Sequence, residues 1–255
     1  MCSVVSALNS LSNLVVDPYL WPSLPKRFLH LPTYDIGGEE CMMVTRDDAC
    51  CWVVYCHGNS VTLTDLWESG IPTAITESCR CNFVAPKYPQ KTSSGQQYDR
   101  QVVECVQRVY EQLQEDTQSS VYLIGRSIGA AIATRSCQKS KPSGLVLISG
   151  FSSVRQQSPW ALRWLIPDRL NNLKSVQNLK GVPTLIIHGK NDLLVSPENA
   201  DAIANAHGNA KVVIIPDMTH TPLPSNINVI CKHVRTLIDE SNSATITHHY
   251  SQWRK

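Results

Sequence analysis

The stretch VYLIGRSIGAAIAT, residues 121–134, decides the fold. Its first four residues are apolar and favour a strand, whereas the small and apolar residues from Ile128 onward favour a helix. Ser127 lies at the turn between them. Gly125 and Gly129 leave room for a turn that is too sharp for larger side chains. The pattern predicts a strand, a tight turn and a helix, with the Ser127 hydroxyl exposed at the carboxyl edge of a sheet.

Short apolar runs rich in β-branched residues recur on both sides of this stretch. They alternate with longer segments of helical period, which is typical of an α/β domain with a mostly parallel central sheet and helices on both faces. Apolar residues at helical spacing within 102–113 and 227–238 predict two amphipathic helices. The further strands are expected at 41–45, 51–56, 82–85, 145–149, 184–187 and 212–215.

Length and composition limit the class of protein. A chain of 255 residues with 42% apolar and 17% charged residues can build one large core, which excludes collagen, coiled-coil and disordered proteins. The net charge of +2 and the lack of a Lys/Arg cluster argue against a nucleic-acid partner.

The two ends of the chain differ from its middle. Four prolines predict an irregular lead-in over 1–36, and the helical period stops after residue 240, which predicts a disordered tail over 241–255. The folded domain is therefore expected over 37–240. The prolines of the lead-in are Pro18, Pro22, Pro25 and Pro32.

The ten cysteines stand singly or in close pairs, several of them inside apolar runs such as CCWVVYC. This usage predicts buried, reduced thiols and a cytoplasmic protein. The N-terminus has neither the pattern of a signal peptide nor an apolar run long enough to span a membrane. Cys2 is the one candidate for acylation there, and a single acyl chain gives only weak peripheral contact with a membrane.

Two later strands end in the residues that a nucleophilic serine needs. The run PTLIIHGKND ends at Asp192, and KVVIIPDMTH ends at His220. A serine hydroxyl is a poor nucleophile unless an imidazole takes its proton and a carboxylate orients that imidazole. The order serine, acid, histidine at successive strand ends predicts Ser127 as nucleophile, Asp192 as orienting acid and His220 as base.

Other residues compete for these roles. Ser127 could belong to an ordinary strand-to-helix turn. His188, at a strand end, favours a packed structural role, and the remaining rivals lie in helices, turns or the tail. The rival acids are Asp168, Asp201 and Asp217, and the rival histidines are His207, His233, His248 and His249.

Two backbone amides are candidates for an oxyanion hole. Ile128 follows the nucleophile, and Asn59 lies in the glycine-containing turn after the run 51–56. Alternatively, Asn59 caps a helix that starts there. No paired Cys or His spacing and no phosphate-binding loop are seen, so we expect neither a metal nor a cofactor.

Four motifs together resemble the landmarks of the α/β-hydrolase superfamily: HGN at 57–59, GRSIG at 125–129, HGKND at 188–192 and PDMTH at 216–220. Within it, the segment 170–192 is similar to the small, cap-poor, depalmitoylase-like group of α/β-hydrolase-domain-containing proteins. The resemblance implies an α/β-hydrolase fold with a minimal cap. It also implies a serine hydrolase that cleaves a small-molecule ester or an acylated protein, as an esterase or acyl-protein thioesterase.

The chain departs from that group at 86–95, where PKYPQKTSSG replaces a glycine-rich loop. The stretch between residues 149 and 182 is too short for a lid domain. Trp160, Trp164 and Leu165 within it are expected either to form an apolar wall for an acyl chain or simply to pack on the sheet. The tryptophan spacing predicts a short helix.

Two other classes remain open from the sequence. One is a non-catalytic scaffold of the same fold that binds a small ligand or a protein. The other is a serine aminopeptidase, which would need an acidic cluster near the site to hold a substrate amino group. The stretch 150–182 offers only Asp168 for such a cluster.

Overall fold

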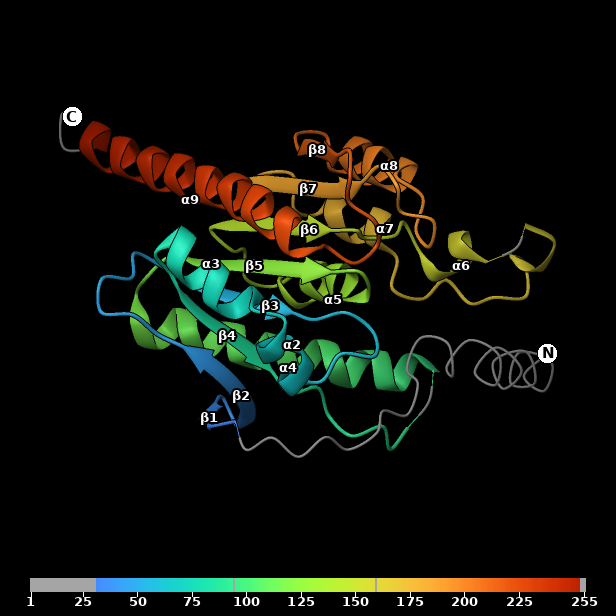
Figure 1. The fold of residues 1–255 in the computed structure, drawn as a ribbon, viewed down its shortest axis with the longest axis horizontal. Coiled ribbons are helices and arrows are strands. Elements are labelled where there is room, and N and C mark those ends of the chain that lie inside the picture. The colour runs from blue at the N-terminus through green and yellow to red at the C-terminus, as the bar shows by residue number, and fades with distance from the viewer. Residues whose placement is uncertain (1–30, 94, 159, 253–255) are drawn as a thin grey trace.

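The computed structural model describes residues 31–93, 95–158 and 160–252, which form a central sheet covered by helices on both faces (Figure 1). Its eight strands have the order β1-β2-β4-β3-β5-β6-β7-β8. The pairs β1/β2 and β2/β4 are antiparallel and all other neighbours are parallel. The strands are β1 (Thr33–Ile36), β2 (Glu39–Val44), β3 (Trp52–Cys56), β4 (Asn82–Pro86), β5 (Val121–Arg126), β6 (Gly144–Ile148), β7 (Thr184–Gly189) and β8 (Lys211–Ile215).

The helices divide between the two faces of the sheet. Helices α4, α5, α7 and α8 contribute to one buried cluster, and α2, α3 and α9 contribute to the other. The helices are α2 (Leu63–Glu68), α3 (Ile71–Cys79), α4 (Gly95–Thr117), α5 (Ile128–Ser136), α6 (Val154–Gln157), α7 (Asn172–Gln177), α8 (Glu198–His207) and α9 (Pro224–Gln252), with a 3-10 turn η1 at Trp160–Leu162.

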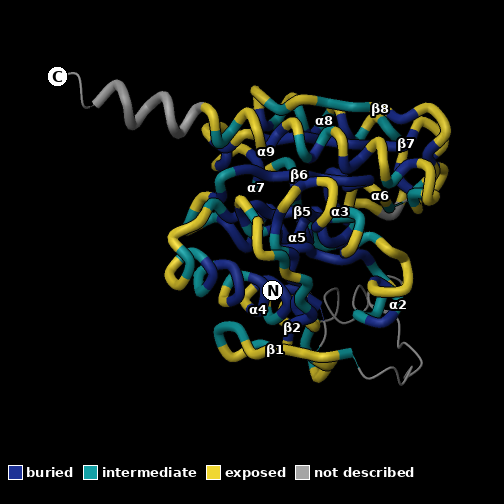
Figure 2. The backbone as a smooth tube through the Cα atoms, turned by 60° about the vertical axis from the view of Figure 1, so that its left-hand side comes forward, coloured by how far each residue is buried: buried dark blue, intermediate teal, exposed yellow. Residues whose placement is uncertain are grey.

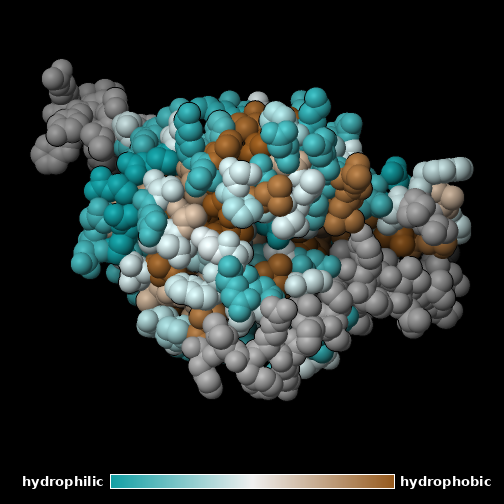
Figure 3. All heavy atoms as spheres, viewed as in Figure 1, coloured by the Kyte–Doolittle hydropathy of each residue, from teal (hydrophilic) through white to brown (hydrophobic). Residues whose placement is uncertain are grey.

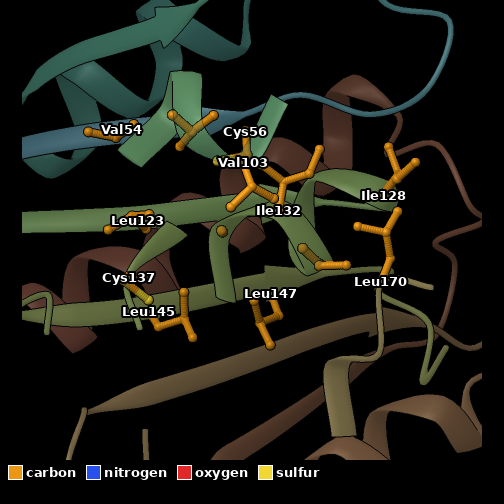
Figure 4. Packing of buried hydrophobic residues seen from close by; sticks show 14 of the residues in the cluster. Val54, Cys56, Val103, Leu123, Ile128, Ile132, Cys137, Leu145, Leu147 and Leu170 are labelled. Atoms are coloured by element: carbon orange, nitrogen blue, oxygen red, sulfur yellow. The ribbon is translucent and has the colours of Figure 1, made fainter. Parts of the chain in front are cut away.

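Side chains of the central strands alternate between the two clusters. In β5, Leu123 joins the cluster under α4 and α5, whereas Tyr122 and Ile124 join the cluster under α3 and α9. Figure 4 shows part of the first cluster, to which both Leu123 of β5 and Ile132 of α5 belong. Because both faces are covered, the central strands are mostly apolar and almost entirely buried (Figure 2).

Strand β1 lies in the stretch that the prolines predict to be irregular, so the sheet starts before residue 37. Ile36 pairs with Glu39, which leaves Gly37 and Gly38 as a two-residue turn. Both glycines have positive φ, 62° and 79°, as a tight hairpin of this length requires. The prolines before the hairpin obscured this turn signal.

Helix α9 continues through Gln252, which differs from the disordered tail expected over 241–255. No glycine or proline interrupts this stretch, and the Tyr122 hydroxyl contacts Asn242 Oδ1 at 3.1 Å. The apolar period stops because the helix leaves the sheet and not because the helix ends. Although α9 has 29 residues, no helix in the described ranges combines the length and apolar character needed to cross a membrane.

The nine cysteines within the described residues are all free thiols, as predicted, and eight of them are buried. Cys50 differs from the expectation because it is exposed. Cys2, the candidate for acylation, lies outside the described residues, as does the lead-in over 1–30.

A buried ion pair fixes the segment between β6 and β7 to α4. The Arg169 guanidinium donates to both carboxylate oxygens of Asp99, at 2.9 and 2.8 Å, and both side chains are almost fully buried. Two parallel hydrogen bonds of this kind are among the strongest side-chain contacts, and either charge alone would be costly in the core.

We predict that Asp99→Asn lowers the free energy of unfolding by roughly 3–5 kcal/mol, because the Arg169 charge stays buried without its carboxylate. Urea unfolding followed by circular dichroism measures this. Lys174→Ala is the control, since it breaks an exposed pair with Asp168 and should cost less than about 1 kcal/mol. Equal, small effects of both substitutions would contradict the prediction.

Candidate active site

The turn between β5 and α5 holds Ser127 in a strained conformation, with φ 56° and ψ −120°. Positive φ is uncommon outside glycine and is typical of functional turns. The neighbouring glycines are required for steric reasons. A Cβ at Gly125 would lie 2.3 Å from the Gly129 carbonyl oxygen, and a Cβ at Gly129 would lie 2.0 Å from the Cys56 carbonyl oxygen. The helix therefore starts directly against the ends of β5 and β3.

Loops after β5, β7 and β8 bring the three predicted side chains together. His220 Nε2 lies 3.0 Å from Ser127 Oγ, and His220 Nδ1 lies 2.8 Å from Asp192 Oδ2. Because a carboxylate can only accept, Nδ1 carries the proton and donates it to Asp192. The lone pair on Nε2 is then free to accept the Ser127 hydroxyl proton.

Asp192 is a buried and well-satisfied carboxylate, only 3% exposed. Its Oδ1 accepts the N–H groups of Leu194 and Val195, at 3.0 and 2.8 Å. Burial raises the pKa of this carboxyl, but hydrogen bonds from His188, His220 and the Val195 N–H outweigh burial and hold the pKa well below its usual range. The acid is therefore ionised near pH 7 and fixed in orientation.

His188, predicted as a structural residue, also contacts the acid. Its Nε2 lies 2.9 Å from the Val195 carbonyl oxygen and 3.2 Å from Asp192 Oδ2. Both partners are acceptors, so Nε2 carries the proton and His188 donates to the carboxylate. The position of His188, four residues before Asp192 at the end of the same strand, was the available signal for this contact.

The rival residues lie in other settings. Asp168 pairs with Lys174, and His207 is buried against Thr184. Asp201 lies in the first turn of α8, and Asp217 is exposed in the turn after β8. Helix α9 contains the positions His233, His248 and His249. Across the described ranges, no group of three His, Cys, Asp or Glu residues could hold a metal ion.

The turn after β3 borders the nucleophile. A Cβ at Gly58 would lie 3.6 Å from Ser127 Cβ, so the backbone next to Asn59 is close to the reacting hydroxyl. Helix α2 is capped by Thr62, which rules out Asn59 as its N-cap. Ile128 is the first residue of α5, where backbone N–H groups lack partners within the helix.

A stacked pair of rings stiffens this turn. The His57 ring lies on Tyr88 with centroids 3.8 Å apart, and the Tyr88 hydroxyl donates to the His57 carbonyl at 3.1 Å. Burial lowers the pKa of His57 to about 4, so this ring is neutral at pH 7. Tyr88 comes from the segment 86–95 that departs from the resembled family.

The residues expected to form an apolar wall or to pack on the sheet, Trp160, Trp164 and Leu165, are not buried. Trp160 and Trp164 are 82% and 76% exposed. They lie on a 3-10 helix and in the turn after it, not on one α-helix. Leu165 is half-buried. The stretch projects from the sheet (Figure 1), which fits the exposure of both rings.

Exposed leucines lie beside two of the three site residues. Leu193 and Leu194 follow Asp192 directly, and Leu223 follows His220 by three positions. All three are more than half exposed. Figure 3 shows apolar atoms reaching the surface among hydrophilic ones on one face of the molecule.

Solved structures show the same fold. The chain is 16% identical to TT1662 from Thermus thermophilus, with a TM-score of 0.64 over 82% of this chain and 98% of that one. Est1E from Butyrivibrio proteoclasticus is 15% identical, with a TM-score of 0.64 over 83% of this chain and 98% of that one. A hormone-sensitive lipase from a metagenome library is 19% identical, with a TM-score of 0.62 over 91% of this chain and 90% of that one. The fold is therefore the α/β-hydrolase fold that the four motifs imply.

Sequence comparison gives the family. No curated protein matches the chain. The family model described as serine hydrolase (FSH1) matches residues 77–228, which is more than half of the chain and includes Ser127, Asp192 and His220. The protein therefore belongs to the FSH1 family of serine hydrolases.

Proposed function

We propose that this protein hydrolyses carboxylic esters or thioesters through an acyl-enzyme intermediate on Ser127. The observation that carries the proposal is the continuous pair of hydrogen bonds from Asp192 through His220 to the Ser127 hydroxyl. In this arrangement the base can take the serine proton as the bond to the substrate forms. The strained backbone of Ser127 presents the hydroxyl at the carboxyl edge of the sheet.

The reaction follows from the positions of these atoms. Ser127 Oγ attacks the carbonyl carbon and its proton moves to His220 Nε2, which gives a tetrahedral oxyanion. The N–H groups of Ile128 and Asn59 are proposed to stabilise that oxyanion. The imidazolium then gives the proton to the leaving alcohol or thiol as the bond from that group to the carbonyl carbon breaks, which leaves the acyl group on Ser127 Oγ. Water, deprotonated by the same nitrogen, releases the acid and restores the serine.

The acyl group of the substrate is proposed to be apolar and to bind on an open surface. The leucines at 193, 194 and 223 lie in the loops that carry Asp192 and His220, and their exposure offers contact area for an acyl chain. Residues 149–183 include only short helices, so a large lid domain is absent from the part of them that the structure describes. Acyl-protein thioesters in the cytoplasm are the proposed physiological class, with Cys2 acylation giving weak membrane contact.

The peptidase alternative has less support. Asp168, the acid that a bound amino group would need, is already paired with Lys174 at 3.0 Å. The scaffold alternative has no need for a base within hydrogen-bond distance of a strained serine. The scaffold alternative predicts that the protein fails to turn over simple esters, whereas the peptidase alternative predicts an acidic cluster near the site.

We predict that Ser127→Ala abolishes labelling by a fluorophosphonate probe, because the atom that the phosphorus would bond is gone. Gel fluorescence measures the labelling, and circular dichroism checks that the fold is intact. Ser149→Ala is a matched control, since Ser149 is buried at the end of the adjacent strand. Undiminished labelling of Ser127→Ala would refute the assignment of the nucleophile.

We predict that kcat/KM rises with acyl chain length in a series of p-nitrophenyl esters, by about threefold per added CH₂ group that contacts apolar surface. A matched acyl thioester should be turned over as well. Leu193→Ser should flatten the chain-length dependence and leave hydrolysis of the acetate ester unchanged. A sharp preference for short chains would exclude the acyl-protein thioesterase assignment.

A further inference from the structure

Arg126 links the nucleophile turn to the loop that carries the base. It is the last residue of β5 and directly precedes Ser127. Its Nη2 donates to the His220 carbonyl oxygen at 3.3 Å and to Thr221 Oγ1 at 2.8 Å. One side chain therefore joins two loops whose residues are 94 positions apart in sequence.

The strand order explains why this loop needs a distant hold. β8 is at the sheet edge, with β7 and β6 between it and β5. Three strand spacings amount to about 14 Å, which the loop after β8 must cross to bring His220 to Ser127. Backbone bonds from Lys190 and Asn191 fix the start of this loop, at Ile215 and Met218. These two hydrogen bonds restrain the loop before His220. The backbone at His220 and after it must be held by other contacts.

The Arg126 side chain leaves part of its hydrogen-bonding capacity unused at this position. Within the described residues, its buried Nε has no hydrogen-bond partner. An unsatisfied buried donor is destabilising, and a methionine would fill similar space without leaving a donor unpaired. The contribution of the guanidinium is therefore to be sought in the two bonds from Nη2.

We propose that Arg126 is a positioning residue that holds His220 in reach of Ser127, which rests on the function proposed above. It fixes the His220 carbonyl and the Thr221 hydroxyl, so the imidazole keeps its Nε2 at 3.0 Å from Ser127 Oγ. Asp192 orients the His220 ring from the β7 side, and Arg126 restrains the His220 backbone from the β5 side. Because Arg126 and Ser127 are adjacent, one end of β5 positions both nucleophile and base.

The test compares Arg126→Met, which removes all donors but keeps the apolar stem, with Arg126→Lys, which keeps a donor. For p-nitrophenyl acetate, Arg126→Met should lower kcat about 10- to 100-fold, because a small displacement of the base is enough for such a loss. KM should stay within about twofold, since Arg126 is not proposed to contact substrate. Arg126→Lys should restore part of kcat, and Thr221→Val should show a smaller loss.

A second background separates positioning from a general effect on folding. If Arg126 acts through the base, Arg126→Met should cause no further loss of single-turnover p-nitrophenol release in a His220→Ala protein. Thermal unfolding of each variant accompanies the rates. If Arg126→Met does not fold, Thr221→Val decides the matter, because it removes one acceptor and little volume.

Full kcat in folded Arg126→Met, or an equal further loss in the His220→Ala background, would overturn the positioning role. So would a Thr221→Val protein with unchanged kcat where Arg126→Met does not fold. These outcomes leave wild-type esterase activity intact. By contrast, a wild-type protein that neither turns over esters nor reacts with a fluorophosphonate removes the proposed function itself, and this inference with it.

Discussion

The close approach of two backbones at Gly129 is the constraint on which the site depends. The first turn of α5 lies so near the end of β3 that any Cβ at this position would overlap the Cys56 carbonyl. This contact holds the helix start against the sheet and leaves Ser127 in its positive-φ conformation. The same contact brings the turn after β3, with Gly58 and Asn59, next to the nucleophile.

Hydrogen bonds to the Asp192 carboxylate fix its charge and the orientation of His220. Asp192 accepts two backbone N–H groups and two imidazole N–H groups, so it stays ionised despite its burial. Its fixed charge determines which nitrogen of His220 is free to face Ser127. The sheet supplies the framework for this, because β5, β7 and β8 end at one edge.

The sequence predicts well those features that each depend on one strand and the residue after it. The seven apolar runs, the turn at Ser127 and the strand ends that bring Asp192 and His220 to it are of this kind. The hairpin at Gly37 was obscured by prolines upstream, and the end of α9 was misjudged because helix formation does not require an apolar face. The contacts of Arg126 join two loops that are distant in sequence, and periodicity carries no information about such contacts. The exposure of Trp160 depends on whether another surface meets it, which no local pattern records.

The Asp99–Arg169 pair also bears on how the site could change during evolution or engineering. Arg169 lies just before α7 in the segment that joins β6 to β7, and its buried partner Asp99 fixes this point to α4. The exposed turn around Trp160 lies upstream of this anchor. A longer or shorter stretch can therefore replace the turn while the ion pair keeps the return to β7 in register. A lid could therefore be inserted at the turn around Trp160. It would alter access to Ser127 without disturbing the core.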